Sequence, residues 1–327
     1  MKTQFGHSLS SSFYLWVDDR ITRFAEGVFT GKSQIFSYSS AVDTPSGFNS
    51  FFSPKRQFCA GHELSPSGVF VNGTGIEQSA TGQKMLIDHD QGRILLDSSF
   101  GTSVTVSGNF VEKEINVYES NESQEELIIN KDFVIAGDTK TFLETKGQQG
   151  QRRYTLPAVF VTDHHAQNKG LCFGGIDETK AVFRVLVVGL NKYQIDGILS
   201  LFTDAHHRAF GIIRYEDFPY GPYWYVKEPP YSYPDLISNN TFLAAHIESV
   251  TGYKLKDAAQ AKLGGRSLFF GFLDFQLKIA RTEGDMLKRL VFYTTGGEAS
   301  IQKRVRLEPD SDGRCVVIVD GVERARI

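Results

Sequence analysis

The residues best suited to metal chemistry are three short clusters that combine histidine with aspartate. They are Asp88-His89-Asp90, Asp163-His164-His165 and Asp204-Ala205-His206-His207. Imidazole and carboxylate groups that converge in space could hold zinc, manganese or iron, which leaves open a metal-dependent hydrolase. Adjacent histidines, however, point to different sides of a strand or helix, and no cluster has the i, i+4 spacing of a zinc-protease helix. We therefore expect solvated loops here, with no metal and no cofactor.

Other catalytic signatures are weaker still. The chain has no G-x-S-x-G nucleophile elbow, and its paired glycines lack the following Lys-Ser/Thr of a phosphate-binding loop, so they are typical of turns. Asp18, Asp19 and Arg20 fit the solvated face of a helix better than a catalytic acid pair. A glycosidase needs two carboxylates, and nothing in the sequence selects a particular pair. The sequence therefore predicts a protein that is not an enzyme.

Aromatic residues cluster in one proline- and glycine-rich stretch, residues 215–234, with the sequence YEDFPYGPYWYVKEPPYSYP. The prolines and glycine interrupt regular structure, so this stretch is predicted to be either a packed, ordered loop or a contact arm. Its candidate interaction residues are Phe218, Tyr220, Tyr223, Trp224, Tyr225, Tyr231 and Tyr233. Aromatic rings can stack on sugars, which leaves open a carbohydrate-binding or receptor-binding module.

Basic residues alternate with apolar ones near the C-terminus, at Lys303, Arg304 and Arg306, and again at Arg324 and Arg326. In a strand, this alternation places part of the positive charge on one face. Such a face could meet nucleic acid or an acidic neighbour. The alternative is a solvated sheet edge whose charges discourage aggregation.

The elements that must position these residues begin with a helix. Ser12 can cap it, and apolar residues from Phe13 to Val28 follow at three-to-four spacing. Asn72-Gly73 predicts a type I′ hairpin turn. Residues 84–120 form three consecutive strand patterns, and the apolar alternation changes phase near Phe110, which predicts a bulge or a strand crossing between two sheets.

The second half predicts an α+β unit. Residues 156–161 and 180–190 have strand patterns, Asn191 caps a helix, and residues 210–213 form another strand, which gives a β-α-β unit. Residues 268–279 predict a long central strand, and Asp320-Gly321 predicts a terminal hairpin. The expected fold is strand-rich α+β. An N-terminal helix and β-sheet or sandwich-like domain covers residues 1–150, and an α+β domain covers residues 151–327.

Composition limits the classes of partner and compartment. The 327 residues include 35 basic and 38 acidic side chains, for a net charge of -3, so a general DNA-coating role is not expected. Cys59, Cys172 and Cys315 are widely spaced and fit free thiols in a reducing cytosol. Neither a signal-peptide core nor an apolar run of membrane-spanning length is visible, so we expect a soluble protein without membrane contact.

The run IDHDQGRILLDSSFGTSVTVSGNFVEKEINVY resembles a hairpin followed by a long strand that recurs in virion structural proteins of tailed bacteriophages. Matching positions are Asp88, Gly92, Arg93, Ile94, Gly101, Val104, Val106, Phe110, Val117 and Tyr118. The wider order is similar to structural proteins of marine contractile-tailed phages: LWVDDRI, then TPSGFNSFFSP, then the block from LCFGGIDETK to LSLFTD, then FFGFLDFQLKI.

This resemblance implies a non-enzymatic subunit of a ring at the phage neck or tail, such as a tail terminator, stopper or head-tail connector. The implied partners are copies of the chain itself, in a hexamer or dodecamer, and other neck and tail proteins. The implied location is the virion, after synthesis in the host cytoplasm. Lys303, Arg304 and Arg306 would then be candidates to face a lumen through which DNA passes.

Overall fold

The computed structural model describes most of the chain, in separate ranges. These are residues 4–24, 32–38, 44–53, 57–59, 68–76, 85–130, 132–135, 153–170, 176–205, 208–221, 224–227, 232–255, 268–282, 305–309, 315–319 and 322–326. The chain forms two compact units: Met1–Ala166 with Ala181–Lys278, and Gln167–Lys180 with Ile279–Ile327. This division differs from a boundary near Gln151, a residue outside the described ranges. The strand-rich α+β class is confirmed.

Helix α1 (Gln4–Phe24) begins before the expected cap at Ser12. Its apolar stripe is buried as predicted, with Phe13, Val17 and Ile21 inaccessible to solvent. The Phe13 ring lies 4.4 Å from the Phe183 ring and 5.1 Å from the Phe275 ring, centre to centre, so this helix packs directly on a sheet. The end of the predicted stripe at Val28 lies outside the described residues.

Antiparallel strands form a seven-stranded sheet in the order β4-β3-β7-β1-β2-β6-β5. The strands are β1 (Lys32–Tyr38), β2 (Phe48–Phe52), β3 (Gly68–Val71), β4 (Thr74–Ile76), β5 (Met85–Asp88), β6 (Arg93–Asp97) and β7 (Val106–Phe110), and a short 3-10 helix η1 (Ser98–Phe100) follows β6. The β3–β4 hairpin is confirmed: Asn72 and Gly73 have φ of 49° and 81°, the positive values that its turn requires.

A second sheet has six strands in the order β13-β14-β15-β12-β11-β8. The strands are β8 (Asn116–Glu119), β11 (Ala158–Gly170), β12 (Ile176–Gly189), β13 (Ala209–Ile213), β14 (Thr241–Lys254) and β15 (Phe269–Thr282). Strands β7 and β8 belong to different sheets, which confirms that the phase change near Phe110 marks a crossing. The central position predicted for β15 is also confirmed.

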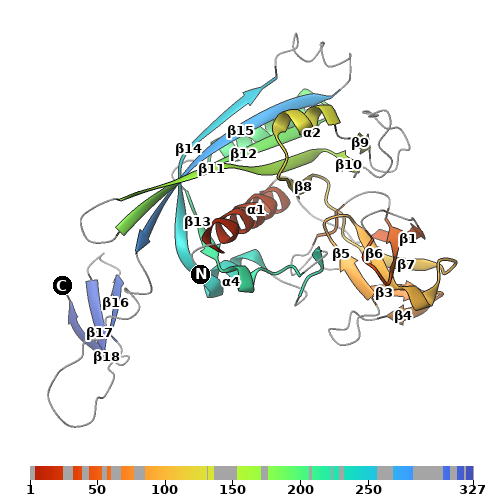
Figure 1. The fold of residues 1–327 in the computed structure, drawn as a ribbon, viewed down its shortest axis with the longest axis horizontal. Coiled ribbons are helices and arrows are strands. Elements are labelled where there is room, and N and C mark those ends of the chain that lie inside the picture. The colour runs from red at the N-terminus through yellow and green to blue at the C-terminus, as the bar shows by residue number, and fades with distance from the viewer. Residues whose placement is uncertain are drawn as a thin grey trace. The chain divides into compact units, whose positions relative to one another are not determined.

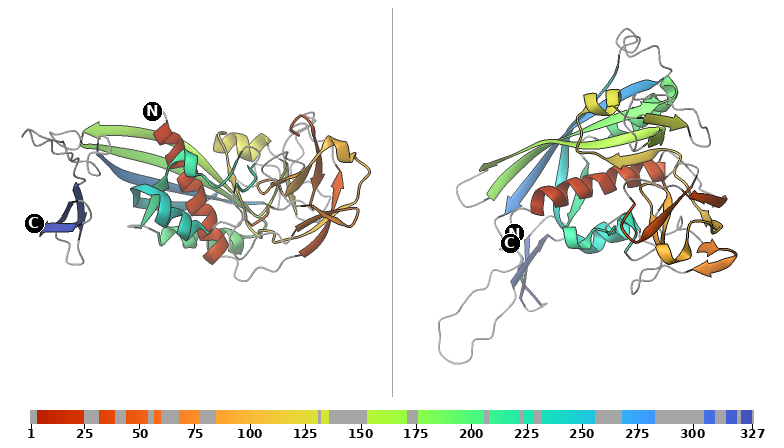
Figure 2. Two further views of the ribbon diagram at one scale, coloured as in Figure 1. Left: turned by 90° about the horizontal axis from the view of Figure 1, so that it is seen from below. Right: turned by 45° about the vertical axis from the view of Figure 1, so that its right-hand side comes forward.

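Helices cover both faces of the six-stranded sheet (Figures 1 and 2). Helix α1 lies on one face and α2 (Gln124–Asn130) on the other, where the paired strands β9 (Asp132–Ile135) and β10 (Arg153–Leu156) share its core. The remaining helices are α3 (Lys192–Thr203), η2 (Tyr215–Asp217) and α4 (Tyr233–Asn240). The sequence patterns predicted neither α2 nor β9.

The Asn191 cap of α3 is confirmed, because its side chain accepts a hydrogen bond from the Gln194 N–H. The β-α-β prediction needs a correction. The order β12, α3, β13 is correct along the chain, but β14 and β15 lie between β12 and β13 in the sheet. Strands far apart in sequence had to be paired to show this, and local patterns carry no such information.

Strands β16 (Val305–Pro309), β17 (Cys315–Val319) and β18 (Val322–Arg326) form a separate three-stranded antiparallel sheet. The β17–β18 pairing confirms the terminal hairpin. Across all described residues, no helix combines the length and the apolarity needed to cross a membrane.

Candidate functional site

A polar pocket of about 340 Å³ lies beside the first turns of α1. Its lining residues are Gly6, His7, Ser10, Asp90, Glu119, Asn121, Asp163 and Trp224. Helix α1 supplies the first three, the β5–β6 turn supplies Asp90, the end of β8 and the following loop supply Glu119 and Asn121, and β11 supplies Asp163. The pocket therefore unites residues that are far apart in sequence.

Two carboxyl groups in this pocket have perturbed acidities. Burial raises the pKa of Glu119, and the nearby charge of Asp163 raises it further. Burial also raises the pKa of Asp163, while a hydrogen bond from the Ser10 hydroxyl and the proximity of His7 act in the opposite direction. Such a pair favours either a shared proton or a cationic or hydroxyl-rich ligand.

Two aromatic contacts shape the pocket wall. The His7 ring lies 4.7 Å from the Tyr215 ring, centre to centre, and the Tyr14 ring lies 5.3 Å from the Trp224 ring. Trp224 has a positive φ of 56°, which is strained for a bulky residue. Its carbonyl accepts a hydrogen bond from the His89 N–H, which helps to hold this backbone in place.

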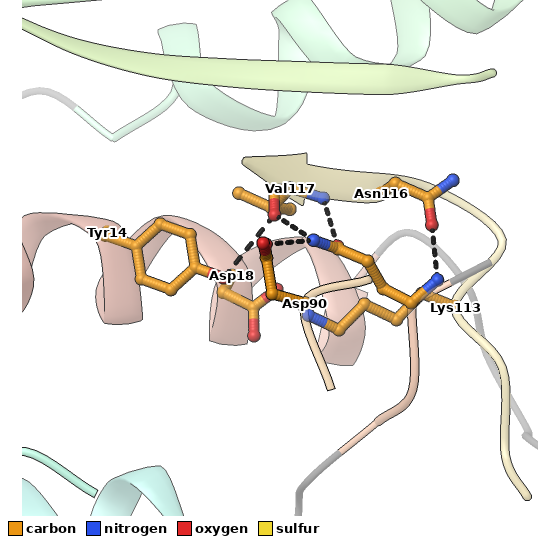
Figure 3. Close-up of polar contacts among 7 residues, drawn as sticks. Tyr14, Asp18, Asp90, Lys113, Asn116 and Val117 are labelled. Atoms are coloured by element: carbon orange, nitrogen blue, oxygen red, sulfur yellow. Dashed lines mark hydrogen bonds and ion pairs between the residues drawn. The ribbon is translucent and has the colours of Figure 1, made fainter. Parts of the chain in front are cut away.

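A buried hydrogen-bond network lies next to the pocket (Figure 3). The Gln57 side-chain amide donates to the Asp90 carboxylate at 2.8 Å and to the Val117 carbonyl at 2.6 Å, and it accepts from the Val117 N–H at 2.7 Å. The Gln57 N–H donates to the Asn116 side chain at 3.0 Å, and the Tyr14 hydroxyl also reaches the Val117 carbonyl. The network fixes Asp90 relative to α1 and β8.

Figure 3 also contains a buried ion pair between Lys113 and Asp18, with 2.6 Å between Nζ and Oδ1. Arg20 is buried as well, and its guanidinium donates to the Leu201 carbonyl at 2.9 Å and 3.1 Å. The expectation of a solvated face at Asp18 and Arg20 is therefore wrong. Asp18 can be buried with its charge because it pairs with Lys113, and Arg20 because it donates to the Leu201 carbonyl. Sequence spacing does not reveal these partners.

The cluster Asp88-His89-Asp90 is buried, which corrects the expectation of a solvated loop. Asp88 pairs with Arg93 at 2.7 Å. The pKa of His89 is lowered to about 4, chiefly by burial and in smaller part by the nearby charge of Lys113. His89 is therefore a neutral core residue near neutral pH, and Asp90 is the cluster member that lines the pocket.

The other two histidine clusters contribute less. Asp163 lines the pocket, while His165 is exposed and the His164 side chain lies outside the described residues. His206 and His207 also lie outside them. Within the described ranges, no three His, Cys, Asp or Glu side chains are placed to hold a metal ion. No geometry among these residues therefore favours a metal-dependent hydrolase.

The aromatic loop is packed rather than extended. Phe218, Tyr220 and Tyr233 are buried within the chain, which agrees with the packed loop of the two predicted alternatives and not with an exposed contact arm at these three residues. Trp224 and Tyr225 are half-buried, and Tyr223 and Tyr231 lie outside the described residues. The rings of Phe218, Tyr220 and Trp224 lie 5.3–6.1 Å apart, centre to centre, which explains the burial: the aromatic residues pack on one another.

The basic C-terminal candidates remain untested. Lys303 and Arg304 lie outside the described residues, and Arg306 belongs to β16, where only the backbone is described. The lumen-facing role of all three is therefore still an expectation.

Three pocket residues were singled out from the sequence: Trp224 as an interaction candidate, and Asp90 and Asp163 as members of the histidine–aspartate clusters. The other five were not. His7, Ser10 and Asn121 are common polar residues without a motif, and only the long-range packing of α1 brings His7 and Ser10 to Glu119. A search of protein-family models, curated proteins and solved structures finds no match to this chain.

Proposed function

We propose that this chain is a non-enzymatic structural subunit of a ring at the neck or tail of a tailed-phage virion, acting as a terminator, stopper or connector. The observation that best supports assembly is the exposure of β11. Five consecutive residues of this strand, from His165 to Lys169, are exposed. The virion context rests on the sequence resemblance described above.

Consecutive exposure matters because alternate residues of a strand point to opposite faces. Five exposed neighbours therefore mean that none of the described residues covers either face of this part of β11. Strand β11 has 13 residues and β12 has 14, against roughly five or six in a common strand. Long strands that are uncovered on both faces are suited to packing against another subunit.

In this proposal the partners are further copies of the chain, as a hexamer or dodecamer, together with neighbouring neck and tail proteins. Head-to-tail contacts generate such rings when the rotation closes. Arg306, with Lys303 and Arg304, would face the lumen and contact passing DNA through phosphate groups.

The test is the size and shape of the purified full-length chain, measured by light scattering and negative-stain microscopy over a range of concentrations. Rings with a central hole, and incorporation of the chain into purified virions, are expected. The variant Ala166→Glu adds a charge to the exposed part of β11 and should prevent ring formation without lowering the melting temperature. Glu114→Lys, a charge change at another exposed position, is the control. Virions that lack the chain would overturn the proposal.

A carbohydrate-binding module is the second candidate, and the pocket favours it. Trp224 offers a ring for stacking, and Asp90, Glu119, Asn121 and Asp163 offer polar groups to sugar hydroxyls. Binding of oligosaccharides, measured by calorimetry and lost in Trp224→Ala but kept in Tyr193→Ala, would support this function. Tyr193 is a suitable control because it is exposed on α3, outside the pocket lining.

A further inference from the structure

Strand β14 has an outer edge that no described strand covers over its last residues. Strand β13 pairs with β14 only from Thr241 to His246, whereas β15 accompanies β14 as far as Lys254. Residues 251–254 are all exposed. This segment therefore lies at the border of the six-stranded sheet within the described part of the chain.

The register shows which backbone groups point outward. The Leu255 N–H donates to the Phe270 carbonyl at 3.0 Å, so Leu255 directs its backbone groups toward β15. In an antiparallel ladder the direction alternates from residue to residue. Thr251 and Tyr253 therefore also face β15, while Val250, Gly252 and Lys254 direct their N–H and C=O groups away from it.

Features that usually protect an edge are weak in this segment. Proteins discourage edge pairing with proline, with outward charge or with a covering element. Residues 249–254 contain no proline, and their single charged side chain, Lys254, forms an ion pair with Asp196 of α3. The edge thus offers alternating donors and acceptors to another strand.

We propose that this edge pairs with the same edge of a second copy of the chain, antiparallel and about a two-fold axis at Gly252. This register uses all three outward residues: Val250 lies opposite Lys254 of the second copy, and Gly252 lies opposite its own equivalent. A two-fold contact of this kind is isologous, because each copy contributes the same surface.

Side chains on both faces are compatible with this register. On one face, the exposed Tyr253 ring stacks on Phe272 at 5.0 Å, and Tyr253 would lie opposite Thr251 of the second copy, a favourable aromatic and β-branched pair. On the other face, Gly252 has no side chain at the axis, and Thr203 of α3 lies beside it, with its Cγ2 atom 3.1 Å from the position that a Cβ would take. No like charges are opposed, since each Lys254 meets a valine.

The contact does not depend on the virion role proposed above. A ring needs a head-to-tail contact, whereas this contact is two-fold, so either can exist without the other. Because one strand pair buries less area than a standard interface, we expect a weak dimer, with a dissociation constant roughly in the micromolar range.

The first experiment measures self-association of the full-length chain by sedimentation equilibrium. Val250→Pro removes one outward N–H and no ladder bond to β15, so it should weaken dimerisation by roughly tenfold or more while the melting temperature is retained. Val250→Ala is the matched control, since it shortens the side chain but keeps the N–H, and it should dimerise like the wild type. Equal dimerisation of the Pro and Ala variants would overturn the proposal.

The second experiment tests the register by cross-linking. A mixture of Thr251→Cys and Tyr253→Cys chains should form a disulfide-linked heterodimer under oxidation, because these two positions face each other across the axis. Each variant alone should form no more cross-link than the wild type, whose three cysteines set the background. A chain that is monomeric at all concentrations, or cross-links that are equal in single and mixed samples, would reject this pairing.

Discussion

His89 is a neutral imidazole in the core, and its position makes the protein sensitive to acid. The ring lies near Phe58 and Tyr220, and burial lowers its pKa to about 4. In the unfolded chain the pKa returns to about 6.5. Between these two values the unfolded state binds a proton that the folded state does not, so stability is retained above pH 6.5 and falls as the pH drops toward 4.

We expect this histidine to lower the free energy of unfolding by about 3 kcal/mol between pH 6.5 and pH 4. The measurement is urea unfolding at several pH values. His89→Gln cannot take up a proton at this position. Its unfolding over this interval should therefore take up about one proton fewer than that of the wild type, and its free energy of unfolding should change less with pH, whatever its absolute stability. An unchanged slope would show that His89 does not titrate as described.

Glu119 has the opposite effect on pH dependence. Its pKa is raised in the folded state, so the proton is released more easily on unfolding, and its ionisation lowers stability as the pH rises above the ordinary glutamate range. Glu119→Gln should therefore raise the melting temperature at pH 7 and give a smaller gain at pH 4. The control is Glu114→Gln, at an exposed position. A gain that is independent of pH would argue against a charge effect.

At the scale of elements, the contact between α3 and β15 depends on the absence of a side chain. A Cβ atom at Gly271 would lie 2.7 Å from Ile195 Cγ2 and 3.3 Å from both terminal methyl groups of Leu199. Gly271→Ala should therefore force the helix away from the sheet and cost roughly 1–3 kcal/mol in the free energy of unfolding.

The matched control is Gly197→Ala, in the exposed part of the same helix. Its Cβ would meet no described atom within 4 Å, and alanine is the better helix former by about 1 kcal/mol. This variant should be more stable than the wild type by chemical unfolding. Equal losses in the two variants would show that helix propensity, and not the approach to β15, governs this region.

The sequence predicted individual turns, caps and strands better than it predicted which strands and helices lie next to one another. Local signals were sufficient for the Asn72-Gly73 turn, the Asn191 cap and the crossing near Phe110, because a turn, a cap or a change of alternation is encoded by adjacent residues. The separation of β12 from β13 and the burial of Asp18 depend on contacts between distant segments. The pocket could not be predicted for the same reason, since it joins α1, β8 and β11.

At the scale of the whole molecule, the two compact units differ in what stabilises them. Strands β16–β18 form a sheet of their own, and none of them pairs with the six-stranded sheet. Removal of residues 305–327 should therefore leave the main thermal transition of the larger unit unchanged within about 2 °C, as measured by calorimetry. A larger decrease would mean that the terminal sheet supports that unit.

Assembly of the molecule would involve two separable contacts, a head-to-tail contact that closes a ring and a two-fold contact through β14. A dodecamer can combine both, whereas a single hexameric ring needs only the first. The size distribution of Val250→Pro therefore separates them: rings that persist while their pairing is lost would indicate that both contacts exist.

Gln57 has a further consequence for the opposite border of the six-stranded sheet. Its side-chain amide occupies the N–H and C=O of Val117 in β8, as the backbone of an added strand would. A single glutamine thus acts as a strand mimic, and it closes this border without adding the exposed edge that a further strand would create. Strand addition at β8 would first have to displace this amide from the buried network, which makes that border a terminus of the sheet.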